Sequence, residues 1–244
     1  MKKLIVTICC ALCMAVCALG QQAIIHENAV RPAMTKSYVE GVKKLKEACT
    51  ANKIKMSWRT IVFEDNSYAH VLPVEGTASL QTNLFGDLEA KIGADAFASL
   101  IAPIREAIDS RTESISIAMP DLSYLDPLAG ENYRMILFLV PLDGKEAEME
   151  KVFAEWKKTY QSKKVTENYH LYRITSRPDA GYMISLSAKN PADMEAKRAK
   201  TNQIVGQDVI AALWDKQVAL AKKYYWKRGY FIPELGYDHS VAAN

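Results

Sequence analysis

The chain has 244 residues, of which 49% are hydrophobic and 24% are charged, and its formal charge is +3 at neutral pH. This length and apolar content suffice for one large folded domain or two small ones. The nearly balanced charge gives no support to nucleic-acid binding, which calls for a concentrated basic surface.

Residues 1–20 have the three parts of a secretion signal. Lys2 and Lys3 form a positive start, residues 4–16 are apolar, and small residues lead up to Gly20. The apolar run is too short for a good membrane-spanning helix. We therefore expect cleavage after Gly20 and a mature protein in the periplasm or outside the cell, without a stable membrane anchor.

Removal of this segment changes the composition of the mature chain. Four of the five cysteines leave with it, so only Cys49 remains and no internal disulfide can form. The formal charge falls to +1, with 29 basic and 28 acidic residues. A lipid-modified Cys17 is an alternative, but Val16 stands where that processing signal requires Gly, Ala or Ser. Stability must then come from an ordinary hydrophobic core.

The first part of the mature chain predicts the element order β-α-β-β-α-β. Tyr38, Val42 and Leu45 recur at helical spacing, and the turn residues at 64–67 separate two short strand-like runs. Strands are expected at residues 23–30, 56–63, 68–74 and 115–119, and helices at residues 35–52 and 83–111, the second interrupted at Gly93.

The second part repeats this order. Residues 134–140 are nearly all apolar, as in a strand buried on both faces, and Asn190 before Pro191 is typical of a helix start. Strands are expected at residues 134–140, 169–175, 182–187 and 230–232, with a turn at 177–179, and helices around residues 149–160 and 190–227, the latter interrupted at Gly206.

An internal repeat supports the same division. At a shift of 113 positions, residues 92–98 align with 205–211, and residues 119–124 align with 232–237 through a shared P-[DE]-L-x-Y corner. We therefore predict an α+β protein of two tandem ferredoxin-like (βαββαβ) units, whose antiparallel sheets pack as an α/β barrel. The units are expected at residues 21–124 and 133–244, with a linker at 125–132.

This layout resembles the dimeric α/β barrel superfamily, which includes antibiotic-biosynthesis monooxygenases, haem-degrading monooxygenases and tandem-repeat chlorite dismutase-like proteins. The resemblance covers most of the mature chain and rests on element order and duplication, because no catalytic motif of the family is matched residue by residue. It implies a small-molecule pocket inside the barrel or under the helices, and it does not identify a reaction.

The histidines are the first candidates for chemistry. His70 and His170 lie in equivalent hairpins, where either could bind haem or transfer a proton, with Trp58, Arg59 and Arg173 nearby. The alternative is a histidine held in structural hydrogen bonds. The four histidines of the chain show no H-x-x-x-H spacing, so a metal site is not predicted.

The repeated corner is the second candidate. Tyr124 and Tyr237, with Asp121 and Glu234, could stack on and hydrogen-bond a ligand at the two mouths of the barrel. The structural alternative is a strand end at each proline, followed by a capped turn. Cys49 ends the apolar stripe of the first helix and is expected to be a core residue.

Two further features have structural explanations. The aromatic and basic residues of 222–237 are expected to pack the end of a helix onto its sheet, although they could bind an anionic or planar ligand. Asp95 and Asp208 are expected to cap their helices.

Three functions remain open from the sequence. The first is an exported protein that binds a small apolar or aromatic ligand in the barrel. The second is a cofactor-independent or haem-dependent monooxygenase-like enzyme, and the third is an envelope protein-interaction module. No P-loop, G-x-S-x-G or G-x-G-x-x-G motif is present to decide between them.

Overall fold

A computed structural model describes residues 22–74, 83–176 and 181–239; the expected signal segment and the turn at 177–179 lie outside these ranges. The strands are β1 (Gln22–Val30), β2 (Ser57–Phe63), β3 (Ser67–Val74), β4 (Ile108–Ala118), β5 (Tyr133–Pro141), β6 (Tyr169–Thr175), β7 (Tyr182–Ala188), β8 (Ala221–Phe231) and β9 (Tyr237–Asp238). The helices are α2 (Thr35–Ala51), α3 (Gly86–Ile92), α4 (Ala94–Ala107), α5 (Glu146–Lys163), α6 (Pro191–Val205) and α7 (Gln207–Ala219), with 3-10 turns η2 (Pro32–Met34) and η4 (Pro233–Leu235).

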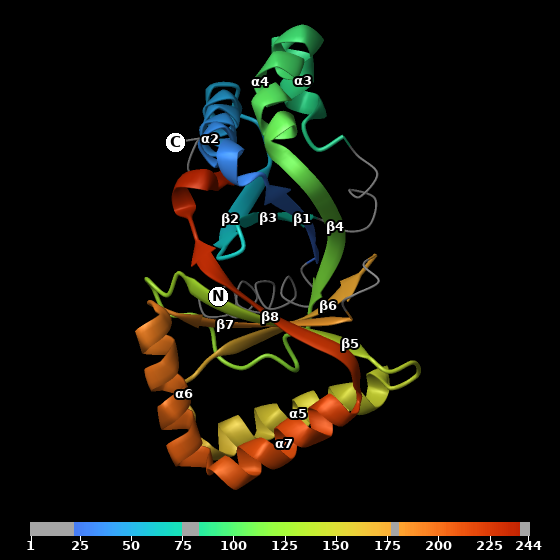
Figure 1. Ribbon diagram of the computed structural model, residues 1–244, viewed down its shortest axis with the longest axis vertical. Helices are drawn as coiled ribbons and strands as arrows, with labels where there is room; N and C mark the ends of the chain where they lie inside the picture. Colours follow the sequence, from blue (N-terminus) through green and yellow to red (C-terminus); the bar gives the residue numbers. More distant parts are fainter. Residues whose placement is uncertain (1–21, 75–82, 177–180, 240–244) are drawn as a thin grey trace, which may run out of the picture.

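The first eight strands form a closed antiparallel barrel. Unit 1 has the strand order β4-β1-β3-β2, unit 2 has the order β8-β5-β7-β6, and the pairings β4–β6 and β2–β8 join them. The helices of each unit cover the outer face of its own sheet, so that the barrel lies between two helical layers (Figure 1). This is the predicted α+β fold of two ferredoxin-like units.

Two helices end earlier than the sequence pattern predicts. The expected helices at 83–111 and 190–227 stop at Ala107 and Ala219, and extended β4 and β8 follow directly. Each of these strands pairs with two neighbours, and the resulting ladder outweighs the local helical preference. The basic and aromatic residues of 221–231 therefore alternate between the two faces of a strand, and they do not complement a helix dipole.

The helix starts partly differ from expectation. Asn190 caps α6 as predicted, because its side chain accepts a hydrogen bond from the backbone N–H of Asp193. Asp95 and Asp208 lie in the first turn of α4 and α7 instead of capping them, because Gly93 and Gly206 occupy the cap positions. Both glycines have positive φ angles, 86° and 99°, a conformation that costs glycine little.

Each P-[DE]-L-x-Y corner fastens a helix of the opposite unit. The Tyr237 hydroxyl donates to the carbonyls of Cys49 and Ile54 at the end of α2, and the Tyr124 hydroxyl donates to those of Tyr160 and Val165 at the end of α5. In return, lysines of α2 and α5 donate to the corner carbonyls. The repeated motif thus links the two units reciprocally.

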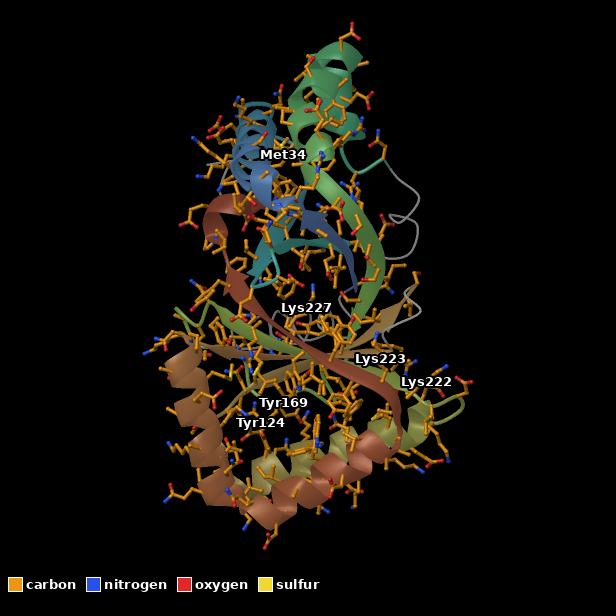
Figure 2. The ribbon with its side chains drawn as sticks, viewed as in Figure 1. Met34, Tyr124, Tyr169, Lys222, Lys223 and Lys227 are labelled. Atoms are coloured by element: carbon orange, nitrogen blue, oxygen red, sulfur yellow. The ribbon has the colours of Figure 1, made fainter. Side chains whose placement is uncertain are left out.

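Large side chains fill the centre of the barrel. The rings of Phe138 and Tyr225 stack with their centroids 4.9 Å apart, and aliphatic side chains of the neighbouring strands pack around them. Lys227 extends into this core, where its ammonium group lies 4.6 Å from the Phe63 ring centroid and 2.6 Å from Glu27 Oε1 (Figure 2). Side chains of the described residues thus pack at the centre of the barrel, and a ligand inside the barrel stays a prediction.

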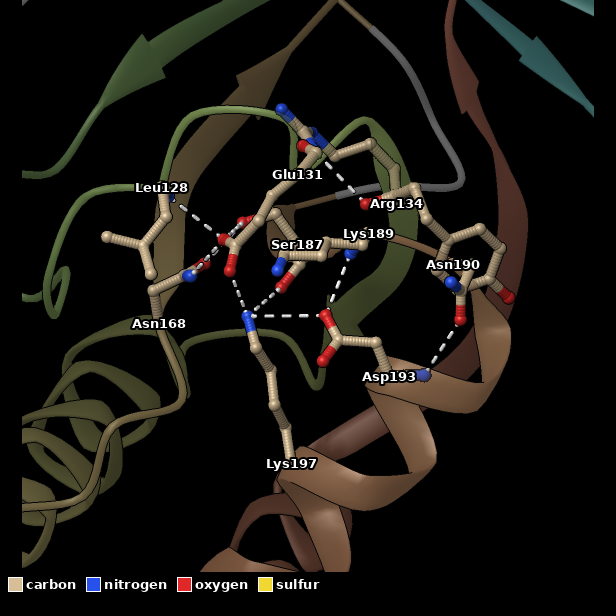
Figure 3. Close-up of polar contacts among 10 residues, drawn as sticks. Leu128, Glu131, Arg134, Asn168, Ser187, Lys189, Asn190, Asp193 and Lys197 are labelled. Atoms are coloured by element: carbon tan, nitrogen blue, oxygen red, sulfur yellow. Dashed lines mark hydrogen bonds and ion pairs between the residues drawn. The ribbon is translucent and has the colours of Figure 1, made fainter.

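A buried ion pair connects the segment between the units to α6 (Figure 3). The Glu131 side chain is 1% exposed and pairs with Lys197, which is 16% exposed. The Glu131 carboxylate also accepts hydrogen bonds from the Asn168 amide, the Ser187 hydroxyl and the Leu128 N–H. Burial alone would raise the pKa of Glu131, but the hydrogen bonds from Lys197 and its other donors hold it below its usual value.

Candidate functional site

Each unit has a pocket between its helices and the outer face of its sheet. The unit-1 pocket has a volume of about 360 Å³ and lies between strands β1, β3 and β4 and helices α2 and α4. The unit-2 pocket has a volume of about 440 Å³ and lies between strands β5–β8 and helices α5, α6 and α7. Both volumes fall within the range of small-molecule sites. The position under the helices is the second of the two locations that the family resemblance implies.

Six aromatic side chains line the unit-2 pocket. Within it, Trp214 and Trp226 have nearly parallel rings, at an interplanar angle of 23°, while Trp156 meets the Tyr160 ring edge-on. The six aromatic residues that line this pocket are Phe153, Trp156, Tyr160, Tyr169, Trp214 and Trp226. Such walls favour a flat ligand that stacks on one ring and meets the edges of others.

Three polar atoms at this pocket are buried without a hydrogen-bond partner among the described residues. They are Trp156 Nε1, Glu167 Oε1 and the Tyr169 hydroxyl. Figure 2 places Tyr169 on the helix side of the unit-2 sheet, away from the barrel interior where Lys227 lies. Because a buried polar group without a partner costs about 1–3 kcal/mol, these three atoms call for a partner such as water or a ligand.

The second oxygen of the Glu167 carboxylate accepts a hydrogen bond from the Tyr160 hydroxyl at 3.0 Å. Burial raises the pKa of Glu167, while the hydrogen bond from Tyr160 and the charge of Arg198 act in the opposite direction. The pocket therefore offers a donor at Trp156, an acceptor at Glu167 and a hydroxyl that can serve as either.

The polar side of the unit-1 pocket contains a continuous chain of hydrogen bonds. Arg111 Nε donates to Asn28 Oδ1 at 2.8 Å, and Asn28 Nδ2 donates to the Tyr38 hydroxyl oxygen at 2.8 Å. The Tyr38 O–H is thereby left to donate to His70 Nε2, at 2.7 Å. His70 then carries its proton on Nδ1 and donates to Thr60 Oγ1 at 3.0 Å. Both ring nitrogens of His70 are therefore used, and the imidazole is neutral.

His70 gives the protein a specific acid sensitivity. Its pKa is lowered to about 3 by burial and by the neighbouring His26 and Arg111. Because the folded-state value lies below the value of about 6.5 in the unfolded chain, its contribution to stability is complete above pH 6.5 and is lost as pH falls. We expect His70 to lower the free energy of unfolding by about 1.4 kcal/mol per pH unit through this window.

Urea denaturation of the wild type and of His70→Asn, followed between neutral pH and mild acid, measures this effect. The variant is expected to be less stable at neutral pH. The slope of its unfolding free energy against pH is expected to be smaller, by an amount that corresponds to about one bound proton. His26, whose pKa is also lowered by burial, contributes to the slope that remains. Equal slopes in the two proteins would contradict a neutral His70 in the folded protein.

The structure brings two of the predicted site residues together. His70 and Trp58 both line the unit-1 pocket, although the Trp58 indole N–H already donates to the Leu235 carbonyl at 2.7 Å. Arg59, the next residue on β2, points to the opposite face of the strand. Cys49 is fully buried, and burial raises the pKa of its thiol to about 12.

The other predicted residues lie outside both pockets. His170 Nε2 is 3.1 Å from Asp126 Oδ1, and Arg173 forms an ion pair with Glu150. The hydroxyls of Tyr124 and Tyr237 donate hydrogen bonds to backbone carbonyls of the opposite unit.

The sequence analysis missed the polar residues that do meet at the pockets. These residues are His26, Asn28, Arg111, Trp156, Glu167 and Tyr169. Their grouping depends on strand register and on which helix covers which strand, and a single sequence specifies neither.

The closed barrel of two ferredoxin-like units, with a pocket under each helical layer, is the dimeric α/β barrel fold. Solved structures with this fold include a putative monooxygenase from Lactobacillus acidophilus, at 7% identity and a TM-score of 0.57, with 90% of this chain and 97% of that chain covered. A mutant chlorite dismutase from Candidatus Nitrospira defluvii matches at 9% identity and a TM-score of 0.55, over 92% and 96% of the two chains.

A haem-binding protein from Thermus thermophilus matches at 9% identity and a TM-score of 0.50, with 88% and 92% of the chains covered. No family model and no curated protein matches the sequence. At these identities the likeness establishes the fold alone. The neighbours include a haem-binding protein and a chlorite dismutase, so the fold is one that accommodates small-molecule partners.

Haem iron is held by His, Cys, Met or Tyr side chains, and the two pockets differ in which of these they offer. Among the described residues that line the unit-2 pocket there is no histidine or cysteine, the Met135 sulfur accepts a hydrogen bond from Arg198, and burial raises the pKa of Tyr169. In the unit-1 pocket both nitrogens of His70 are hydrogen-bonded, which leaves His26 as the histidine of the described lining that could hold haem, because its Nε2 has no hydrogen-bond partner among the described residues and faces the Glu113 carboxylate at 3.4 Å.

A metal site receives no support either. Within the described ranges, no group of three or more His, Cys, Asp or Glu side chains is arranged to hold a metal ion. In the same ranges, no helix is long and apolar enough to cross a membrane.

Proposed function

We propose that this chain is an exported small-molecule-binding protein, and that its unit-2 pocket binds a planar aromatic compound carrying hydroxyl or carbonyl groups. The observation that carries the proposal is the coincidence of six aromatic walls with three buried, unpartnered polar atoms among the described residues. Export is proposed from the signal pattern of residues 1–20.

The chemistry of the pocket sets the ligand class. Trp156 Nε1 can only donate, so the ligand needs an acceptor such as a carbonyl oxygen. Glu167 Oε1 accepts when it is ionised, so the ligand also needs a hydroxyl or N–H donor. Arg198 and Arg228 line the same pocket and favour an electron-rich or partly anionic ring system.

Titration with 1,8-dihydroxyanthraquinone tests this proposal, because the compound combines a flat ring system with carbonyl and hydroxyl groups. Three of the four tryptophans of the chain line the pocket, so binding is expected to quench the intrinsic fluorescence strongly. Trp156→Phe removes one donor and keeps an aromatic wall, and we expect it to weaken binding about tenfold, or ~1.4 kcal/mol.

Tyr230→Phe is the matched control, because Tyr230 is partly exposed on β8 and does not line the pocket. It is expected to leave the affinity unchanged. Native mass spectrometry and an absorption spectrum of protein purified from its own envelope then identify the natural ligand. Equal affinity in the wild type and Trp156→Phe, together with a clean apo mass, would overturn the proposal.

A further inference from the structure

The unit-1 pocket differs chemically from the unit-2 pocket, and its polar groups follow the strand register. His70 of β3, His26 of β1 and Glu113 of β4 stand in one row across the sheet. One step along the same face, Leu72, Ile24 and Ile115 form an apolar row. The floor of the pocket is thus polar on one side and apolar on the other.

The helices that cover the pocket continue the apolar side. Val42 and Leu45 of α2 and Phe97, Ile101 and Ile104 of α4 line it. A ligand that fills this volume therefore needs an apolar body and a polar group at one end only.

His26 is the group on the polar side that remains available to a ligand. Its Nε2 atom is buried and has no hydrogen-bond partner among the described residues, whereas His70, Asn28 and Tyr38 are joined to one another. The Glu113 carboxylate lies 3.4 Å from this nitrogen, and its side chain is 61% exposed. Water therefore weakens the interaction of Glu113 with His26.

The charges around the polar side favour an anion. Arg111 of β4 and Arg105 of α4 line the pocket together with Glu113, which leaves an excess of positive charge. The other titratable groups at this pocket are His70 of β3 and Tyr38 of α2, and both are uncharged in their hydrogen bonds. A negative group beside His26 Nε2 would thus meet a ring nitrogen without a hydrogen-bond partner among the described residues, in a pocket whose lining carries two arginines and one glutamate.

We propose that the unit-1 pocket is a second ligand site that binds a monocarboxylic acid with an apolar body, and that His26 takes up a proton as the carboxylate binds. The proton comes from the solvent, and the product is an imidazolium–carboxylate pair at His26 Nε2. Burial keeps His26 neutral in the free protein, because it lowers its pKa, and the arriving negative charge reverses this effect. Proton uptake therefore accompanies binding.

Isothermal titration calorimetry with decanoate tests the proposal near neutral pH, in phosphate and in Tris, whose ionisation heats differ. The difference between the two buffers is expected to report uptake of about one proton per decanoate. Decan-1-ol and decylamine have the same apolar chain without the carboxylate. They are expected to bind at least about tenfold more weakly.

Two substitutions at the pocket have opposite expected effects. His26→Gln keeps a polar group but cannot accept a proton, so we expect it to weaken decanoate binding about tenfold and to abolish proton uptake. Glu113→Gln removes the negative charge that faces the same nitrogen, so it is expected to tighten binding severalfold. A merely structural role of these two residues would not produce effects of opposite sign.

Trp156→Phe is the control for the other pocket and is expected to leave decanoate binding unchanged, because Trp156 belongs to unit 2. The test of this second site is therefore independent of the test of the proposed aromatic ligand. Equal binding of decanoate and decan-1-ol, absence of proton uptake, or weaker binding by Glu113→Gln would each overturn the proposal.

Discussion

Replacing Gly229 with alanine is expected to prevent the barrel from closing. Gly229 lies on β8, where it pairs with Phe63 of β2 on one side and Arg134 of β5 on the other. A Cβ atom at this position would lie 2.2 Å from the Val62 carbonyl oxygen and 2.9 Å from the Phe63 Cα. Both neighbours are backbone atoms of the paired strand, so no side-chain rotation can relieve the contact.

We expect Gly229→Ala to lower the free energy of unfolding by at least about 3 kcal/mol, because the β2–β8 pairing must separate. The β2–β8 ladder joins the two units, so its loss exposes the apolar interior of the barrel. Urea denaturation measures the stability, and hydrogen exchange at the amides of residues 61–63 and 229–231 locates the opening.

Gly86→Ala is the matched control. Gly86 is the first residue of α3, and a Cβ there meets only Asn83 at ordinary contact distances of 3.5–3.6 Å. This variant is expected to keep the stability within about 0.5 kcal/mol of the wild type. Similar stabilities for the two variants would contradict the tight β2–β8 approach.

Replacing Lys197 with methionine is the second substitution for which a large effect is expected. It leaves the buried Glu131 carboxylate without its positive partner, although Asn168, Ser187 and the Leu128 N–H still donate to it. We expect a loss of about 3–5 kcal/mol at neutral pH, which is typical when one partner of a buried pair is removed.

The double variant Glu131→Gln/Lys197→Met distinguishes charge from packing. It removes both charges, so it is expected to be more stable than Lys197→Met alone. Lys216→Met is the control, because the pair between Lys216 and Glu155 is about half exposed and should contribute at most about 1 kcal/mol. A double variant no more stable than Lys197→Met would show that lost packing accounts for the effect.

The acid dependence gives an independent check on Lys197. In the wild type the pKa of Glu131 is held below its usual value, so the stability it contributes is present above the unfolded-state pKa and is lost as pH falls. Without Lys197 the same carboxyl protonates at higher pH, because burial then dominates. The difference in unfolding free energy between the wild type and Lys197→Met is therefore expected to become smaller as pH falls below about 5.

The sequence alone determined the element order, the duplication and the fold class. These follow from short-range chemistry: apolar spacing in α2 and α5, the Asn190 cap with Pro191, and turn residues between β2 and β3. The repeated corner was visible in the sequence as well. Its use, in which each tyrosine fastens the opposite unit, required the three-dimensional arrangement.

Only the tertiary structure decided where the helices stop and where the pockets lie. Residues 221–227 have a helix-compatible sequence but extend as β8, because they fill the position between β5 and β2. His26 and Glu113 are 87 positions apart in the sequence, and Trp156 and Tyr169 come from a helix and a strand. Their meeting depends on register and packing between distant segments, which local residue patterns do not contain.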